Sequence, residues 1–413
     1  MKLSSRTLFL HRLRCSLDRT GLGFRICPAH ILLILMCLLM LLSTVGCGDD
    51  SPGEGAESDT TVQSDSGVDM REDAEPDLGE MGEEVEEEPD ARYSLKMNGE
   101  PGATYTYQLM RSQVKSASGF DARQTQTYDL KLKVMNVNDD GSSVLGVTFN
   151  RVRVKIVAPV ARPDSAGNPI LDSAGNVKMF EETVEFDSKK EQNLPGSEEY
   201  RALIGREMLV TIDRSGAVQD VANTTPVLNA LLTSLKINPD TVDPRQLQFA
   251  QNRIDTEVLT AVTLILRRNL PDSAMPVGGS WKKSDEQALA GGIPAKTTYT
   301  HTLGGLREID GEKAVRVDVK LSTDTKIPKE SLDNELISMK ISTMDVSGEG
   351  ESVFNVNNGF PMRKKTALRT HFEGSGTMKQ GPDKGKSEKV NFRETVSTSV
   401  KLIAATASPG PGE

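Results

Sequence analysis

Apolar and polar residues alternate along most of this 413-residue chain from about residue 93 onward. Residues 104–109 and 128–135 both follow this period of two, and the second segment leads into the turn-like sequence Asn138-Asp139-Asp140-Gly141. Residues 143–149 and 152–156 then resume the alternation. Alternation on both sides of an Asp-Gly turn predicts a hairpin of antiparallel strands. One face of the resulting sheet is expected to be apolar and the other solvated.

The same alternation returns in the rest of the chain, so the prediction extends to a large sheet. Further strands are expected at residues 208–212, 217–221, 297–303, 306–309, 314–321, 337–344, 348–354, 362–372 and 390–403. Residues 103–109, which precede Asp140-Gly141, are similar to residues 296–303, which precede Asp310-Gly311. This likeness suggests that a strand unit is duplicated on either side of the central region.

The central part of the sequence shows helical spacing instead. Residues 226–235 form a short apolar segment, and Asp243 then offers an N-cap before a proline, Pro244, at the first helical position. An apolar stripe follows at intervals of three and four residues, which predicts a long helix that ends near Asn269. The stripe contains Leu247, Ala250, Ile254, Val258, Ala261 and Ile265. It is expected either to pack on the sheet or to line a groove that admits a lipid.

Together these patterns predict an α+β fold that is predominantly antiparallel β. We expect a large curved sheet or half-barrel with the central helices packed on it. The β-rich domain spans residues 93–403, with strands at 93–221, helices at 226–269 and further strands at 279–403. The tail, residues 404–413, is rich in Pro and Gly and is expected to be disordered.

The N-terminus has a different pattern. Basic residues precede an apolar run at residues 31–42, which is the layout of an export signal and is too short for a spanning helix. The next residues resemble the end of bacterial lipoprotein signal peptides, with Thr44, Val45, Gly46 and Cys47 at the matching positions. Gly46 and Cys47 fit this pattern, whereas Thr44 and Val45 depart from it. The resemblance implies that the signal is removed and that Cys47 carries a lipid.

Two alternatives stay open for this N-terminal segment. The signal, residues 1–46, could be cleaved after Gly46 without lipidation, or it could remain as a short anchor. In either case the other cysteines, all of which precede Cys47, belong to the signal segment.

The segment from Cys47 to Arg92 is strongly acidic. Residues 48–92 are rich in Asp, Glu, Gly, Ser and Pro and contain no Phe, Trp or Tyr. Such a composition cannot bury enough apolar surface to offset the entropy of ordering, so residues 47–92 are expected to form a disordered tether. The tether accounts for the net charge of −10, since the domain that follows is nearly neutral. A nearly neutral domain argues against nucleic acid as a partner.

The domain offers little for catalysis. His301 and His371 are its two histidines, and their wide separation favours ordinary strand residues over a metal site or a general base. No cysteine follows Cys47, so the domain has no thiol nucleophile. Residues 381–387 are similar to a phosphate loop but lack its spacing and the helix after it. Trp281 is expected to be a core anchor. We therefore expect no catalytic residue, no metal and no cofactor.

Five short motifs stand out within the domain. They are residues 101–107, 137–141, 205–216, 277–281 and 348–354. They resemble an uncharacterised family of exported bacterial proteins, many of them lipoproteins, for which no activity is assigned. The resemblance implies a shared fold over most of residues 93–403, and it carries over no functional residues.

These expectations lead to one principal hypothesis about function. We expect a lipoprotein held in the bacterial cell envelope through the lipid on Cys47, with its domain facing the periplasm or the exterior. Its expected role is the non-enzymatic binding of a lipid or another hydrophobic ligand, and its expected partner is the membrane. The alternatives are a structural or protein-interaction module of the envelope, or a hydrolase whose carboxylate pair no spacing reveals.

Overall fold

A computed structural model describes most of the chain after residue 80. The described residues are 81–86, 90–117, 120–165, 168–173, 177–191, 194, 196–266, 271, 273–289, 293–327, 332–333, 337–380 and 384–407. The expected signal, Cys47 and most of the expected acidic tether and tail lie outside these residues. No helix among the described residues is long and apolar enough to cross a membrane.

The structure is dominated by one antiparallel sheet of 14 strands. Its main path runs β1-β11-β12-β14-β15-β16-β3-β4-β5-β7-β8, while β10 pairs with β11, β13 with β14 and β6 with β5. The first half contains β3 (Thr104–Ala117), β4 (Phe120–Val137), β5 (Ser143–Ala161), β6 (Met179–Asp187), β7 (Glu207–Ile212) and β8 (Val218–Ala222). The second contains β10 (Ser280–Leu289), β11 (Ile293–Ile309), β12 (Glu312–Thr325), β13 (Leu332–Asp333), β14 (Ile337–Asn355), β15 (Pro361–Met378) and β16 (Ser387–Thr406). The prediction of a predominantly antiparallel β fold is confirmed.

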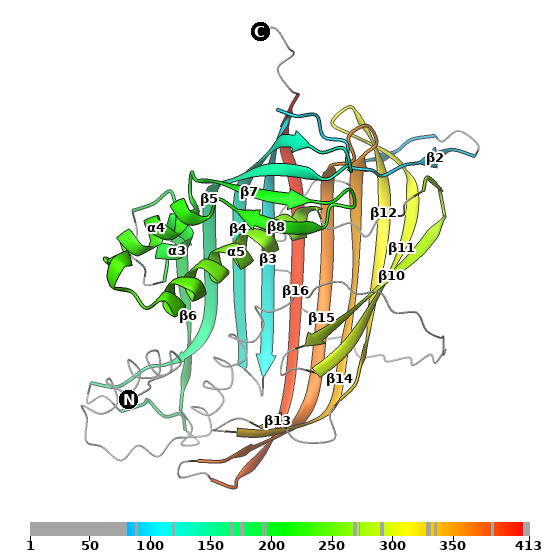
Figure 1. Ribbon diagram of the computed structural model, residues 1–413. Coiled ribbons are helices and arrows are strands. Elements are labelled where there is room, and N and C mark those ends of the chain that lie inside the picture. Colours follow the sequence, from blue (N-terminus) through cyan, green and yellow to red (C-terminus); the bar gives the residue numbers. More distant parts are fainter. Residues whose placement is uncertain are drawn as a thin grey trace.

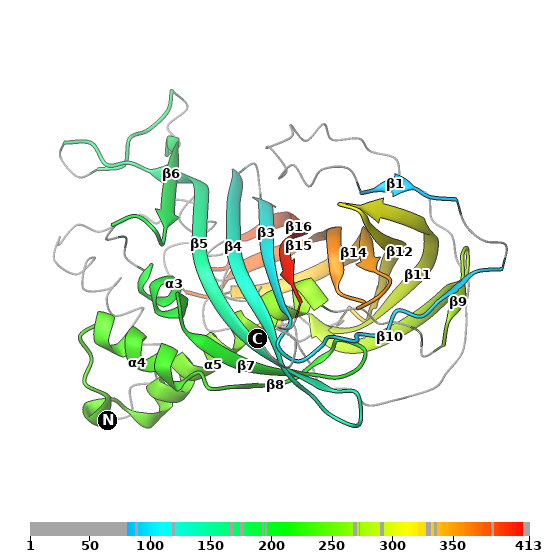
Figure 2. The same ribbon diagram turned by 90° about the horizontal axis from the view of Figure 1, so that it is seen from above.

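Each half of the sheet is largely a meander of successive hairpins. The halves meet where the last long strand, β16, pairs with the first, β3. The expected hairpin around Asp140-Gly141 forms between β4 and β5, and Gly141 adopts the positive φ of 83° that such a turn requires. Seen from above, the strands from β5 through β16 to β11 follow an arc, so the sheet is a trough with a concave and a convex face (Figure 2).

Glycine permits close strand contact on the inner face of β14. A Cβ added at Gly350 would lie 2.6 Å from Cγ2 of Thr366 and 2.7 Å from the carbonyl oxygen of Lys365 on β15. Because one of these atoms belongs to the backbone, a side chain at this position would force the two strands apart.

Three α-helices are present among the described residues: one lies between β6 and β7 in the sequence, and two lie between the two halves of the sheet. They are α3 (Glu198–Leu203), α4 (Thr225–Ser234) and α5 (Pro244–Leu266), with a short 3₁₀ turn at Pro239–Thr241. The predicted N-cap is present, since the backbone N–H of Arg245 donates to Oδ1 of Asp243 at 2.9 Å. The predicted end of the helix near Asn269 lies outside the described residues.

Helix α5 lies inside the trough and closes part of it (Figures 1 and 2). Its residues Val258, Val262 and Ile265 are fully buried against inward-facing residues of the first half of the sheet. Those strand residues include Tyr107, Leu109, Leu130, Leu132, Leu145, Val147, Phe149, Met208 and Val210. We call this assembly the helix-covered core. It also reaches the second half, because Nζ of Lys364 on β15 donates to the carbonyl oxygen of Leu264 at 2.7 Å.

A smaller apolar cluster stabilises the second half of the sheet. Leu95, Leu303 and Phe354 belong to it, and Trp281 packs against it. The ring of Trp281 also stacks on the buried His301, with 5.1 Å between the centroids. Trp281 is thus an anchor in a packed cluster, and His301 is a strand residue beside it.

Part of the expected tether joins the sheet. Strand β1 (Glu83–Glu84) pairs with β11, and the carboxylate of Glu84 lies 2.8 Å from the guanidinium of Arg307. The backbone N–H of Val85 donates to Leu306 at 3.2 Å. Further along, β2 (Arg92–Tyr93) pairs with β9 (Met275–Pro276). This edge of β11, which β10 leaves unpaired, supplies backbone partners and a cation that an acidic segment can use.

Candidate functional site

The concave face continues beyond the helices. In Figure 1, α3, α4 and α5 lie beside the upper half of the sheet, while β3, β14, β15 and β16 extend further down. Residues on these strands can be assigned to the concave or the convex face from their spacing. On β15, Lys364 contacts α5, and Phe372 lies eight residues later along an unbroken register with β16. An even spacing keeps both side chains on the same face, about 27 Å apart along the strand.

A second apolar cluster occupies this far part of the concave face, and we call it the distal cluster. Its buried members are Ala117, Ala122, Phe372, Val390 and Phe392. The rings of Phe372 and Phe392, which are cross-strand partners, stack with 4.9 Å between their centroids. Half-buried side chains of Ala158, Met339, Ile341, Met344 and Met378 surround them.

Apolar residues also connect the two clusters. Leu321 on β12 and Leu368 on β15 flank Gly348 on β14, and Leu368 pairs with Val396 on β16. The side chains of Leu321, Leu368 and Val396 are half-buried and face inward at the same level of the trough. These three side chains form an apolar band between the helix-covered core and the distal cluster, and we call it the apolar wall. The inward-facing pairs Thr366–Thr398 and Thr370–Glu394 border it on β15 and β16.

Polar residues on β3 interrupt this wall beside the apolar path. Lys115 is only 5% exposed, and its Nζ lies 3.5 Å from Oε1 of Glu394 on β16. Nε2 of Gln113 donates to the same Glu394 oxygen at 2.5 Å. Burial lowers the pKa of Lys115, although the charge of Glu394 opposes this effect. Arg111 lies on the same face, and among the described residues it forms no ion pair and no hydrogen bond.

A group of ionisable residues borders the polar stretch on the side of the helices. The hydroxyl of Tyr128 donates to Oε1 of Glu257 at 2.5 Å, and the guanidinium of Arg253 lies 2.8 Å from Glu199. Burial raises the pKa of Glu199, and burial together with the charge of Glu257 raises the pKa of Tyr200 to about 12. Such perturbed groups often mark functional sites, and they also occur in structural networks.

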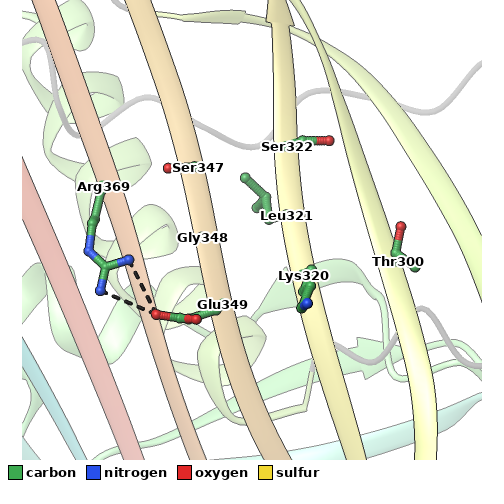
Figure 3. Close-up of a pocket in the computed structure, with 8 residues that line it drawn as sticks. All are labelled: Thr300, Lys320, Leu321, Ser322, Ser347, Gly348, Glu349 and Arg369. Carbon is green, nitrogen blue, oxygen red and sulfur yellow. Dashed lines mark hydrogen bonds and ion pairs between the residues drawn. The ribbon is translucent and has the colours of Figure 1, made fainter. Parts of the chain in front are cut away.

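Two hollows lie in the described part of the protein, and neither is lined by Glu199 or Glu257. The first, of about 360 Å³, is an open hollow on the convex face, lined among others by Lys320, Glu349 and Arg369 (Figure 3). Leu321 and Gly348 of the same strands also line it. Glu349 and Arg369 form an exposed ion pair at 3.2 Å there. The second, of about 140 Å³, lies near Asn355 and Phe360.

The helical stripe predicted from the sequence lies between α5 and the sheet. Ile254, Val258, Ala261 and Ile265 are at most 5% exposed and belong to the helix-covered core, which Ala250 also contacts. Leu247 is half-buried. The stripe thus packs on the sheet, which is the first of its two interpretations. The second was a groove that admits a lipid, and neither hollow is lined by residues of the stripe.

The structure contains no metal centre that the sequence analysis missed within its described part. No group of three or more His, Cys, Asp or Glu side chains there is placed to hold an ion. The missed feature is the distal cluster. Its residues, such as Phe372 and Phe392, lie within predicted strands, but the alternation alone does not show which strands become neighbours.

Comparisons with known proteins find a similarity to a family of unknown function over part of the chain. No curated protein sequence matches the chain. Among solved structures, one that concerns lipid–protein interactions in lipovitellin is 8% identical, with a TM-score of 0.39 over 76% of this chain. It is a much longer protein, since the match spans only 26% of it.

Two further structures resemble the sheet more weakly. An outer membrane channel from Pseudomonas putida F1 is 9% identical, covering 76% of this chain and all of that chain, with a TM-score of 0.13. A protein of the DUF1329 family from Desulfovibrio piger is 8% identical, covering 74% of this chain and 87% of that chain, with a TM-score of 0.13. At such TM-scores these likenesses carry no argument about function. Over residues 173–361, which include the three helices and β7 to β14, the chain is similar to DUF6263, a family of unknown function.

Proposed function

We propose that this protein binds a hydrophobic ligand, namely the acyl chain of a lipid, along the concave face between α5 and the distal cluster. The observation that carries the proposal is the distal cluster itself. It is an apolar group, built around Phe372 and Phe392, that lies on the inner face of the sheet beyond α3, α4 and α5.

The two faces of the sheet differ at this level in the way that such a role requires. Inward-facing Leu321, Leu368 and Val396 are apolar, whereas the outward-facing Lys320 and Arg369 are charged. Apolar surface removed from water stabilises a complex by about 25 cal/mol per Å². An acyl chain that covers the half-buried wall would gain this free energy without disturbing the convex face.

The proposal also places the protein in the cell. A lipid on Cys47 and an acidic tether would hold the trough close to a membrane, where ligands with acyl chains are abundant. The protein would then act without catalysis, as a carrier or a receptor for such a ligand. The proposed site and the expected location in the bacterial envelope are therefore consistent with each other.

Equilibrium binding of palmitate to the purified full chain tests the proposal. Palmitate should displace a fluorescent fatty acid from the wild type, and Leu368→Asn should weaken palmitate binding about tenfold, since it places an amide in the apolar wall. Phe392→Ser should have a similar or larger effect. Circular dichroism of each variant would show whether it is folded.

Phe249→Ser is the matched control, because Phe249 is 69% exposed on α5 and lies outside the proposed site. It should leave palmitate binding unchanged. A wild type that does not bind palmitate would contradict the proposal, and so would a folded Leu368→Asn variant with unchanged affinity.

One observation favours the protein-interaction alternative. Phe249, Leu235 and Ile237 are exposed large apolar side chains on and after α4 and on α5. Exposed apolar residues that lie together can mark a contact surface for another protein. If this is the function, Phe249→Ser should abolish capture of an envelope partner, whereas Leu368→Asn should not affect it.

A further inference from the structure

We infer that the ligand of the concave face carries an anionic head group, a carboxylate or a phosphate, which binds Arg111 beside Lys115. The inference rests on the proposed function and extends it by naming the chemical class of the ligand: an amphiphile with an acyl chain and a negatively charged end.

The position of Arg111 on β3 is the first reason. Leu109 packs in the helix-covered core and Ala117 in the distal cluster, and Arg111 shares their face because its spacing from both is even. In the register of β3 with β4, Arg111 lies between Leu109, which pairs with Tyr128, and Lys115, which pairs with Ala122. Arg111 therefore faces the trough at the level where the helices of the described part of the chain end and the apolar wall begins.

The pattern of charges around Arg111 is the second reason. Among the described residues near Arg111, the carboxylates of Glu394, Glu257 and Glu199 each have a partner. Glu394 pairs with Lys115, Glu257 accepts a hydrogen bond from Tyr128, and Glu199 pairs with Arg253. Arg111 is half-buried and has no such partner among the described residues. A partly desolvated guanidinium without an acid beside it is a recognition point for an anion.

The third reason is the fit of an extended chain. From Arg111 to Ala117 the strand spans about 20 Å, which is comparable with the length of an extended long-chain fatty acid. A carboxylate on the planar fork of Arg111 would accept two parallel hydrogen bonds. Its chain would then pass Val396 and end on the rings of Phe392 and Phe372. Charge and apolar surface are thus arranged in the order that an anionic amphiphile requires.

A comparison of two ligands with the same chain tests the inference. The full-length wild type should bind palmitate at least tenfold more tightly than 1-hexadecanol, because only palmitate offers a charge-assisted hydrogen bond to Arg111. In Arg111→Gln this preference should fall to near onefold, with hexadecanol affinity unchanged. Arg111→Lys should keep part of it, since it retains the charge but loses the fork.

The control variant is Arg369→Gln, which removes an exposed arginine on the convex face. It should leave the preference for palmitate intact. Inorganic phosphate alone, without an acyl chain, should displace palmitate only weakly. A phosphate affinity equal to that of palmitate would overturn the inference in favour of a simple anion site.

The outcomes separate the two claims. If palmitate and hexadecanol bind with equal affinity and Arg111→Gln changes neither, the head-group inference fails while the proposed function stands. If neither ligand binds the wild type, the proposed function fails as well.

Discussion

The helix-covered core and the distal cluster are built from the same strands and differ in what lies over them. Leu109 on β3 and Val400 on β16 are fully buried in the helix-covered core. Eight residues along the same strands, Ala117 and Phe392 lie in the distal cluster, which α5 does not reach. One alternating pattern thus gives a closed core where a helix packs on it and a candidate binding surface where the helix ends.

Equal truncations in the two regions should give the largest difference. Leu266→Ala removes a fully buried side chain from α5 and should lower the free energy of unfolding by about 3 kcal/mol. Leu368→Ala removes a half-buried side chain from the open wall and should cost about 1 kcal/mol. Chemical denaturation of the two variants measures both values.

Palmitate binding should show the opposite order. Leu368→Ala should weaken it severalfold, whereas Leu266→Ala should leave it nearly unchanged as long as the protein is folded. Equal losses of stability in both variants would mean that the open wall is an ordinary part of the core.

The next largest effect on stability should come from a pH-dependent ion pair at the edge of the helix-covered core. The guanidinium of Arg151 on β5 binds both carboxylate oxygens of Asp187 on β6, at 3.0 and 2.5 Å. These hydrogen bonds lower the pKa of Asp187 from 3.8 to about 2. A shift of this size stabilises the fold by about 2 kcal/mol.

The sign of this effect fixes its pH range. Because the pKa of Asp187 is lower in the folded state, its contribution is complete above pH 3.8 and is lost as the pH falls through about 2. Asp187→Asn should therefore reduce stability at pH 7 by about 2 kcal/mol and reduce its acid dependence over this range. Urea denaturation of both proteins at several pH values measures this. A constant difference down to pH 2 would contradict the assignment.

The convex face should show the smallest effect. Glu349 and Arg369 are both more than half exposed in the open hollow of Figure 3, so their ion pair is largely screened by water. Glu349→Gln should change stability by less than about 0.5 kcal/mol and leave palmitate affinity unchanged. Calorimetry and the displacement assay check both. A marked loss of palmitate binding would move the site to the outer face.

The sequence predicted much of the fold because its local periods are strong. The strands around Asp140-Gly141 and the helix that begins at Pro244 lie where the alternation and the capping residue indicate. The stripe ending at Ile265 was also identified as an apolar helix face. These features depend on neighbouring residues in the chain, so the sequence is sufficient to find them.

The candidate site depends on long-range pairing, and this is why it was not predicted. Phe372 meets Phe392 across β15 and β16, but Ala117 joins them from β3, at the other end of the domain sequence. Arg111 is one polar residue in an alternating strand, and only the strand order shows that its cross-strand partners, Gln126 and Thr398, are uncharged. The pairing of β1 with β11 likewise depends on the part of β11 that β10 leaves unpaired, which cannot be identified from the sequence alone.

Photo-crosslinking tests the central claim most directly. A palmitate analogue with a diazirine at the end of its chain would be bound to the full chain, irradiated and located by mass spectrometry of peptides. We expect attachment within residues 368–378 of β15 and residues 387–396 of β16, and loss of this attachment in the presence of excess palmitate. Attachment concentrated on α5 or around Lys320 and Arg369 of the convex hollow would contradict it.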